Sequence, residues 1–435
     1  MAGLEGTRQG KRRTVRRSGS SGLGDVAHAG QLRLSRQVAI KTPRGDDAHG
    51  VSGSTGLAAM EARKAQRAKD IRMQSFSRRA LLAGVGVFGA AAILGGGALV
   101  ARQFGWPFAH GAGSQPQLRW RYQVGAKIFS SPVVGNRAVY FGADSNDVYA
   151  LNVANGHPLW SFSTRGAVTA TPAFANGLLY AASQDGHLYA LDAQTGFPVW
   201  TYATGHALGT SPVVDGQLLY QAAAGVLLTL DASRGLPFWT QRGQGARCST
   251  AALGNDLVCY GATGAVLALD AITGAVRWRY EGQRGELFAR PLLFEDTLFV
   301  GSHSGQFYIL DANTGKLRSQ IPLSGAILDA PVLAGDTLYI SADDGELFAL
   351  RVTDGELNWR FSATGRITHA PVVRNGVVYV GDYDYNVYAL DALTGRLRWR
   401  YACSGPIGAT PAVTQDTLYV TSADGAIYAL TLPSA

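Results

Sequence analysis

The stretch YALDALTGRLRW, residues 388–399, contains two apolar runs on either side of a turn-forming Thr-Gly pair. Nearly the same phrase occurs earlier in the chain, as YALDAQTGFPVW at 189–200 and LALDAITGAVRW at 267–278. The leucine of this phrase and of its weaker relatives recurs at positions 151, 191, 230, 269, 310, 350, 390 and 430. Because the steps are 39 to 41 residues long, the sequence contains an internal repeat in eight copies.

Each repeat is expected to form four short strands. In the second copy these are VTATPAFA, GLLYAAS, GHLYALD and FPVWTYA, separated by NG, QDG and AQTG. Glycine and asparagine suit tight turns with positive φ, and the alternating apolar residues suit strands with packed faces. About 40 residues per four-stranded sheet is typical of a β-propeller. We therefore predict an all-β fold, an eight-bladed β-propeller.

The ends of the repeat region predict how the ring closes. A lone match to the fourth strand, LRWRYQV, stands at 118–124, whereas the last copy stops after its third strand at Leu432. An N-terminal strand that completes the C-terminal blade would leave no open edge between the first and last blades. The predicted propeller spans residues 117–432.

Charge separates the N-terminal region from the repeats. Residues 1–79 hold 17 Lys or Arg against 6 Asp or Glu, a balance of +11, whereas residues 80–435 hold 22 against 25, a balance of −3. Residues 1–75, rich in Gly, Ser and Arg, are predicted to be a disordered basic tail that is either solvated or in contact with anionic surfaces. A near-neutral repeat region argues against nucleic-acid binding by the propeller.

Residues 76–102 are predicted to form a signal or transmembrane helix, followed by a linker at 103–116. The 22 uncharged residues between Arg79 and Arg102 would span roughly 33 Å as a helix, enough to cross a bilayer at residues 80–101. Basic residues on the N-terminal side predict a cytoplasmic N-terminus and an extracytoplasmic propeller, periplasmic or at the cell surface.

The same segment resembles a twin-arginine export signal through SRRALL at residues 77–82. The sequence leaves open whether the signal is cleaved. It also leaves open whether translation starts at Met1, Met60 or Met73.

The repeat itself resembles a known family. The pattern A-x-D-x-x-T-G-x-x-x-W of residues 190–200, matched fully at 268–278 and 389–399, is similar to the tryptophan-docking, WD40-like repeat of pyrroloquinoline-quinone (PQQ)-type propellers. That family includes quinoprotein alcohol dehydrogenases and non-catalytic envelope propellers, among them the propeller lipoprotein of outer-membrane β-barrel assembly. The resemblance implies that the Trp docks between blades, here Trp120, Trp160, Trp200, Trp239, Trp278, Trp359 and Trp399. Ser319 replaces the Trp in one copy, and Arg351 replaces the Asp in the next.

The chemistry of the dehydrogenases is expected to be absent. The resemblance would imply PQQ and Ca²⁺ at the axis with an adjacent Cys-Cys pair, but no two of Cys248, Cys259 and Cys403 are adjacent. The repeats also leave no insertion to cover a cofactor. We therefore predict no enzymatic activity, no cofactor and three buried thiols, with a PQQ- and calcium-dependent dehydrogenase as the alternative.

Candidate site residues are those at which the repeats disagree. The first strand of each repeat is expected to line the axis, and most copies carry a Pro there. Two residues before this Pro, two neighbouring copies have Asp329 and His369. In the copy before them, Arg290 stands one residue before the Pro. These three could form a polar cluster that holds an anionic group or a metal, or a solvated ion pair.

A second departure from the repeat is the turn Asp382, Tyr383, Asp384 and Tyr385, which suits either partner recognition or a local structural role. The favoured function is a monomeric, membrane-anchored propeller that binds an envelope protein.

Overall fold

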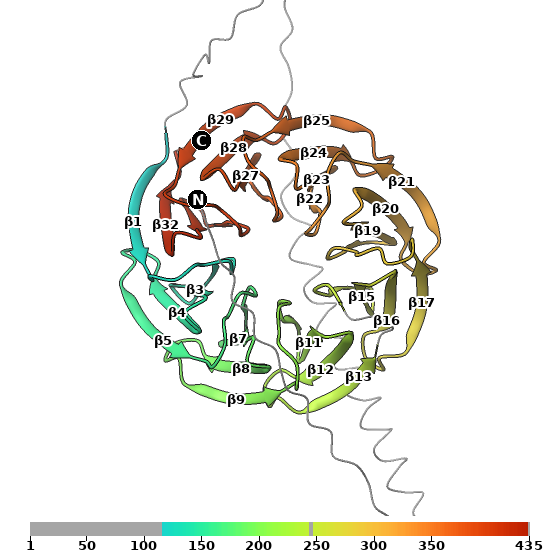
Figure 1. The fold of residues 1–435 in the computed structure, drawn as a ribbon, viewed down its shortest axis with the longest axis horizontal. Helices are drawn as coiled ribbons and strands as arrows, with labels where there is room; N and C mark the ends of the chain where they lie inside the picture. Colours follow the sequence, from blue (N-terminus) through green and yellow to red (C-terminus); the bar gives the residue numbers. More distant parts are fainter. Residues whose placement is uncertain (1–114, 243–246, 434–435) are drawn as a thin grey trace, which may run out of the picture. The chain divides into compact units, whose positions relative to one another are not determined.

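The computed structural model describes residues 115–242 and 247–433. Within them, 32 strands form eight four-stranded antiparallel sheets arranged as a ring (Figure 1). This architecture confirms the predicted eight-bladed propeller. The predicted tail at 1–75 and the helix at 76–102 lie outside the described residues, as does the linker except for its last two residues. The described part of the chain contains no helix long and apolar enough to cross a membrane.

The first four blades follow one another along the chain. Blade 1 contains β2 (Val133–Gly135), β3 (Ala138–Gly142), β4 (Asp147–Asn152) and β5 (Pro158–Ser163), and blade 2 contains β6 (Ala173–Ala175), β7 (Leu178–Ala182), β8 (His187–Asp192) and β9 (Pro198–Ala203). Blade 3 contains β10 (Val213–Asp215), β11 (Leu218–Ala223), β12 (Val226–Asp231) and β13 (Pro237–Arg242), and blade 4 contains β14 (Ala252–Gly254), β15 (Leu257–Ala262), β16 (Ala265–Asp270) and β17 (Val276–Glu281).

The remaining blades keep the same order until the last. Blade 5 contains β18 (Leu292–Phe294), β19 (Thr297–Gly301), β20 (Gln306–Asp311) and β21 (Leu317–Pro322), and blade 6 contains β22 (Val332–Ala334), β23 (Thr337–Ser341), β24 (Glu346–Arg351) and β25 (Leu357–Ser362). Blade 7 contains β26 (Val372–Arg374), β27 (Val377–Gly381), β28 (Asn386–Asp391) and β29 (Leu397–Ala402), and blade 8 contains β30 (Ala412–Val413), β31 (Thr417–Thr421), β32 (Ala426–Thr431) and β1 (Gln117–Gln123).

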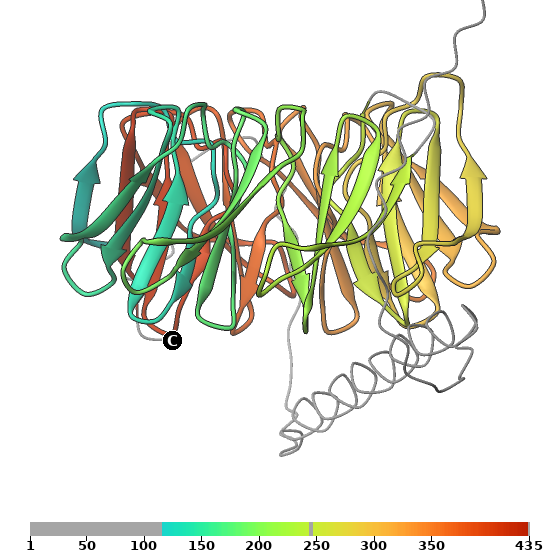
Figure 2. The same ribbon diagram turned by 90° about the horizontal axis from the view of Figure 1, so that it is seen from below.

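The ring closes through blade 8, as the sequence predicts. Strand β1 pairs antiparallel with β32, from Gln117 opposite Thr431 to Gln123 opposite Ala426. A closed ring leaves no unpaired edge between its first and last blades. Viewed from the side, the strands run between two faces of the ring on which the loops gather (Figure 2).

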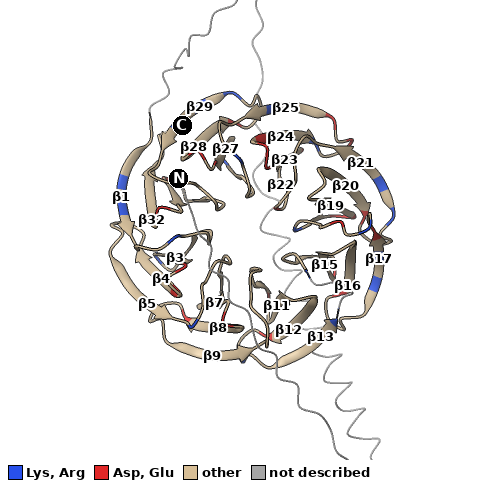
Figure 3. Cartoon of the chain, viewed as in Figure 1, with Lys and Arg blue, Asp and Glu red and all other residues tan. Residues whose placement is uncertain are grey.

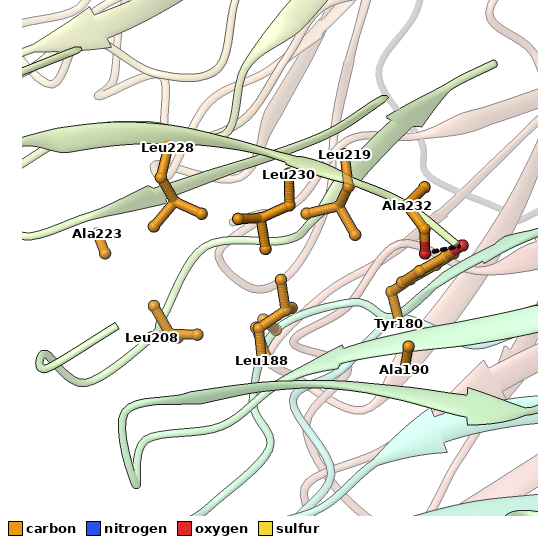
Figure 4. Close-up of a cluster of buried hydrophobic side chains, with 11 residues drawn as sticks. Tyr180, Leu188, Ala190, Leu208, Leu219, Ala223, Leu228, Leu230 and Ala232 are labelled. Carbon is orange, nitrogen blue, oxygen red and sulfur yellow. Dashed lines mark hydrogen bonds between the residues drawn. The ribbon is translucent and has the colours of Figure 1, made fainter. Parts of the chain in front are cut away.

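Local sequence explains the hairpins within each blade. At the turn between β6 and β7, Asn176 and Gly177 have φ values of 54° and 79°, which is the conformation that a two-residue turn needs and that Asn-Gly adopts readily. The middle strands are buried on both faces because each blade is packed between two others. Figure 4 shows Tyr180 and Leu188 of blade 2 against Leu219 of blade 3.

The indole side chains of the outer strands lie at the junctions between blades. Six of them donate through Nε1 to a backbone carbonyl of the next blade, over 2.7–3.2 Å, in the pairs Trp120–Val153, Trp160–Ala193, Trp200–Ala232, Trp239–Ala271, Trp278–Ala312 and Trp359–Ala392. The hydroxyl of Tyr140 donates to the same Ala193 carbonyl, so two side chains share one acceptor. Trp399 packs with Leu430 of blade 8.

The junction between blades 5 and 6 is built differently. Ser319 stands in place of the Trp there, and Ile321, two residues further along β21, lies against Gly355. At six other junctions the equivalent glycine lies against an indole, as Gly315 does against Trp278. A smaller aliphatic side chain therefore covers the place that a Trp fills elsewhere.

Candidate functional site

The innermost strands of the blades surround a cavity of about 1250 Å³ along the axis, which we call the axial cavity. All eight blades contribute to its walls, because the first strand of each blade lies nearest the axis. The lining includes the shared prolines of the repeat, such as Pro132, Pro172 and Pro212. Departures from the repeat next to these prolines therefore lie on the wall of this cavity.

A belt of hydroxyl groups joins neighbouring blades around part of this cavity. The residue before the shared proline accepts a hydrogen bond from the equivalent backbone N–H of the preceding blade: Thr171 N to Ser211 Oγ over 3.1 Å and Ser211 N to Thr250 Oγ1 over 3.2 Å. Thr410 N likewise donates to Ser131 Oγ over 3.0 Å. We call these residues, Ser131, Thr171, Ser211, Thr250 and Thr410, the hydroxyl belt. This belt was not predicted from the sequence, because the repeats were compared at the position one residue earlier. The Ser or Thr that recurs directly before the proline could have revealed it.

The hydroxyl belt is interrupted in blades 5, 6 and 7, where Arg290, Ala330 and Ala370 occupy the same position. Asp329 takes over its role between blades 6 and 7. One of its carboxylate oxygens accepts the N–H of Ala330 over 2.7 Å, and the other accepts the N–H of Ala370 over 3.1 Å. A carboxylate thus holds two adjacent blades where hydroxyls do so elsewhere.

His369 is half-buried beside this carboxylate. Its Nδ1 lies 2.9 Å from Thr368 Oγ1, and its backbone carbonyl accepts a hydrogen bond from Ser341 Oγ. Burial lowers the pKa of His369, and the charge of Asp329 opposes that shift. The imidazole is therefore poorly suited to carry a charge at neutral pH.

The three residues singled out in the axial positions share one cavity without being joined. Arg290, Asp329 and His369 all line the axial cavity, and Arg290 is exposed. In residues 115–242 and 247–433, no hydrogen bond or ion pair links their side chains to one another. Their arrangement is a charged sector of the wall, not an assembled metal site.

The lining of the axial cavity does not fit a calcium-held quinone. Calcium takes six to eight oxygen ligands, whereas the carboxylates on the wall are those of Asp215 and Asp329. Asp329 already accepts two backbone N–H groups. Across the described residues, no group of three or more His, Cys, Asp or Glu side chains could hold a metal ion.

The three cysteines are free thiols. Cys259 is buried, whereas Cys248 and Cys403 are half-buried. Burial raises the pKa of Cys248 to about 11 and those of Cys259 and Cys403 to about 12. Because the thiolate is the reactive form, none of them is activated for nucleophilic chemistry.

The turn at residues 382–385 only partly matches the expectation of a partner-contact turn. Asp382 is 0% exposed and accepts hydrogen bonds from Thr364 Oγ1 over 3.0 Å and from Tyr388 OH over 2.8 Å. Its placement among partner-contacting residues was wrong, because a buried tyrosine hydroxyl on the adjacent strand needs this acceptor. Asp382 therefore stabilises the interior of blade 7 by accepting these hydrogen bonds.

The rest of that turn faces outward to different degrees. Asp384 and Tyr385 are exposed, and Tyr383 is half-buried. Tyr385 has a φ of 71°, an uncommon value for a bulky residue that the tight turn imposes. The exposed part of the turn is thus limited to two side chains.

A larger exposed surface lies on the outer edge of blades 1 to 3. Four apolar side chains are 51–73% exposed there, and we call them the apolar rim: Leu159, Phe197, Val199 and Leu236. They are neighbours across the junctions, because Trp160 lies against Gly196, next to Phe197, and Trp200 lies against Gly235, next to Leu236. The sequence pattern did not reveal this surface.

The equivalent edge of blades 5 to 7 is mixed, because exposed Leu317, Leu357 and Leu397 stand beside charged residues there. Where Phe197 and Leu236 stand before their outer strands, these blades carry Lys316, Glu356 and Arg396. Figure 3 shows β5 and β9 without Lys, Arg, Asp or Glu, whereas β1, β17 and β21 carry basic residues. The outer edge of the ring therefore has an apolar arc at blades 1 to 3 and a mixed arc, charged and apolar, at blades 5 to 7.

Solved structures with this fold include BamB and a quinohemoprotein alcohol dehydrogenase. BamB from Moraxella catarrhalis is similar with a TM-score of 0.63 and 21% identity, over 73% of this chain and 100% of that chain. A quinohemoprotein alcohol dehydrogenase from Comamonas testosteroni is similar with a TM-score of 0.66 and 15% identity, over 74% and 77% of the two chains. At these identities the likeness establishes the fold alone.

Sequence comparison identifies the family. No curated protein sequence matches this chain. The profile of the family described as outer membrane protein assembly factor BamB matches residues 112–171, 262–369 and 353–433, together more than half of the chain. The chain therefore belongs to this BamB-like family of PQQ-type propeller repeats.

Proposed function

We propose that this propeller is a non-catalytic, protein-binding scaffold of the cell envelope. The apolar rim is the observation that carries the proposal. Four large apolar side chains exposed across two adjacent blade junctions form the kind of surface that marks a protein interaction site. In blades 5 to 7, Lys316, Glu356 and Arg396 stand beside the exposed leucines, and these charges would orient the partner toward the apolar rim.

The proposed location rests on the sequence before the propeller. Residues 80–101 are uncharged and follow a basic segment, which favours a membrane anchor with the propeller on the extracytoplasmic side. An anchored propeller would present its rim to proteins of the same membrane or the same compartment. The expected partner is therefore an envelope protein with an apolar contact surface.

A photo-crosslinking experiment tests this proposal. A photoreactive phenylalanine analogue is placed at Phe197 of the full chain in native cells, and the matched control carries it at Lys316, the same repeat position in blade 5. We expect a discrete adduct with one envelope protein from position 197 and none from position 316. Adding Val199→Lys and Leu236→Lys should abolish the adduct. Equal adducts at both positions, or none at either, would contradict the proposal.

The second candidate is a PQQ- and calcium-dependent dehydrogenase. It is favoured by the size of the axial cavity and by the fold shared with quinohemoprotein alcohol dehydrogenases. The carboxylates on the cavity wall do not provide the calcium ligands that such an enzyme needs. We therefore rank it below the binding function.

A further inference from the structure

In six blades, the segment that leads into the first strand carries a buried aliphatic residue four positions before the shared proline. These residues are at most 1% exposed: Ile128, Val168, Leu208, Ile327, Ile367 and Ile407. Three of them lie against a glycine of the preceding blade that has no room for a Cβ, as Val168 does against Gly142. The aliphatic side chain therefore seals the junction between two blades.

Blades 4 and 5 depart from this pattern. The same position holds Arg247, which is exposed, and Leu287, which is half-buried. One residue further along, Cys248 and Phe288 form β-bridges within their own blades, to Ala262 and Ser302 respectively. Both lead-in segments are thus shifted by one residue: Phe288 lies against Gly261 as Val168 does against Gly142, and Arg247 is left exposed one residue before Cys248.

A second cavity of about 250 Å³ lies at this place, and we call it the side pocket. Its lining includes Arg247 from the lead-in to blade 4, Arg290 and His303 from blade 5, and Asp329 from blade 6. Arg290 and Asp329 also line the axial cavity, so the two cavities adjoin. Three basic residues, Arg247, Arg290 and His303, therefore line one small space.

The charges of the side pocket are not balanced by the protein. In the described part of the chain, neither Arg247 nor Arg290 forms an ion pair with a carboxylate. The Asp329 carboxylate is already bound by two backbone N–H groups. With His303 neutral, two guanidinium groups and one carboxylate leave a formal charge of +1.

We propose that the side pocket binds a small oxyanion of the phosphate type, held by Arg247 and Arg290 with His303 at its edge. Guanidinium groups bind phosphate and carboxylate oxygens through paired N–H donors. The carboxylate of Asp329 would repel a ligand that only accepts hydrogen bonds. A hydrogen phosphate carries an O–H that can donate to Asp329, whereas a dicarboxylate such as succinate does not.

The size of the side pocket sets the size of the ligand. Sites for drug-sized molecules enclose about 300–1,000 Å³, and the side pocket is smaller than that range. A tetrahedral ion with a few waters fits this volume. The ligand is therefore inorganic phosphate or the phosphate group of a small monoester, with the remainder of the monoester extending toward the axial cavity.

Calorimetric titration of the full chain with inorganic phosphate, and separately with succinate at the same ionic strength, tests the proposal. Arg290→Thr and Arg247→Ile install residues that other blades carry at these positions, so the fold should be retained. We expect saturable phosphate binding that is about tenfold weaker in each variant, as for the loss of one charge-assisted partner, and absent in the double variant. Arg165→Ser, at an exposed arginine outside the pocket, is the control and should bind as the wild type does.

Each result of the titration has a defined meaning. Phosphate binding that exceeds succinate binding and disappears in the double variant, with circular dichroism unchanged, supports the proposal. Succinate binding as tight as phosphate binding would overturn the role given to Asp329. The site itself is overturned if neither anion saturates, if the double variant binds as the wild type does, or if Arg165→Ser weakens binding equally.

Discussion

Two arcs of the same ring differ in what they place at the axis and at the rim. In blades 8 and 1 to 4, the hydroxyl belt joins adjacent first strands, and the outer edge of blades 1 to 3 is apolar. In blades 5 to 7, Arg290, Ala330 and Ala370 interrupt the belt, the Asp329 carboxylate links blades 6 and 7, and the outer edge mixes charged and apolar side chains. Both arcs keep the same four-stranded blades, so the fold tolerates these changes. Candidate sites therefore lie where the repeat departs from itself.

The largest predicted effect concerns the junctions between blades. Trp278→Ala, at the junction of blades 4 and 5, should lower the free energy of unfolding by about 3–5 kcal/mol, because a buried indole and its hydrogen bond are lost. Ile321→Ala, at the junction that lacks a Trp, should cost only about 1–2 kcal/mol, since this side chain is smaller and half-buried. Urea unfolding of both variants measures the difference. Equal costs would mean that the two junctions are equally strong.

The second prediction compares the two kinds of link around the axis. Asp329→Ala leaves two backbone N–H groups without their acceptor and should cost about 1–3 kcal/mol, whereas Ser131→Ala leaves one and should cost about 1 kcal/mol. The same unfolding experiment provides the measurement. A greater loss in Ser131→Ala would show that the carboxylate link contributes less than the hydroxyl belt.

The smallest effect is a dependence of stability on pH that arises in blade 7. Because burial lowers the pKa of His369 in the folded state, the unfolded chain binds more protons as pH falls through the ordinary histidine range. Stability should therefore decrease between pH 7 and pH 5, and His369→Gln should reduce that decrease. The matched control substitution is His206→Gln, at an exposed histidine outside the axial cavity. An unaltered profile in His369→Gln would contradict the burial of the imidazole. The remaining slope is expected from His303, whose pKa is also lowered by burial.

Much of the fold could be predicted because each blade corresponds to one copy of the sequence repeat. The recurring leucine gives the blade count, and the unpaired strand at 118–124 gives the closure that β1 and β32 form. Both features can be identified from the spacing and order of the repeats in the sequence.

The sites depend on contacts that the pattern does not contain. From the sequence, Asp382 is expected to be exposed, but it is buried and accepts a hydrogen bond from the hydroxyl of Tyr388. The shift that exposes Arg247 is hidden in the sequence, because blade 4 has Ala251 in place of the proline that marks the register. Phe197 and Leu236 look like ordinary strand residues until the junctions bring them together. Exposure and register are properties of the assembled ring.

The central claim, that the propeller binds a protein and not a catalytic quinone, is tested most directly by titrating the full chain with PQQ in the presence and absence of Ca²⁺. Absorbance, melting temperature and dye-linked alcohol oxidation are followed, with a quinoprotein dehydrogenase as positive control. We predict no saturable binding, no change in melting temperature and no oxidation. Saturable, calcium-dependent binding with alcohol oxidation would contradict the claim and make the axial cavity an active site.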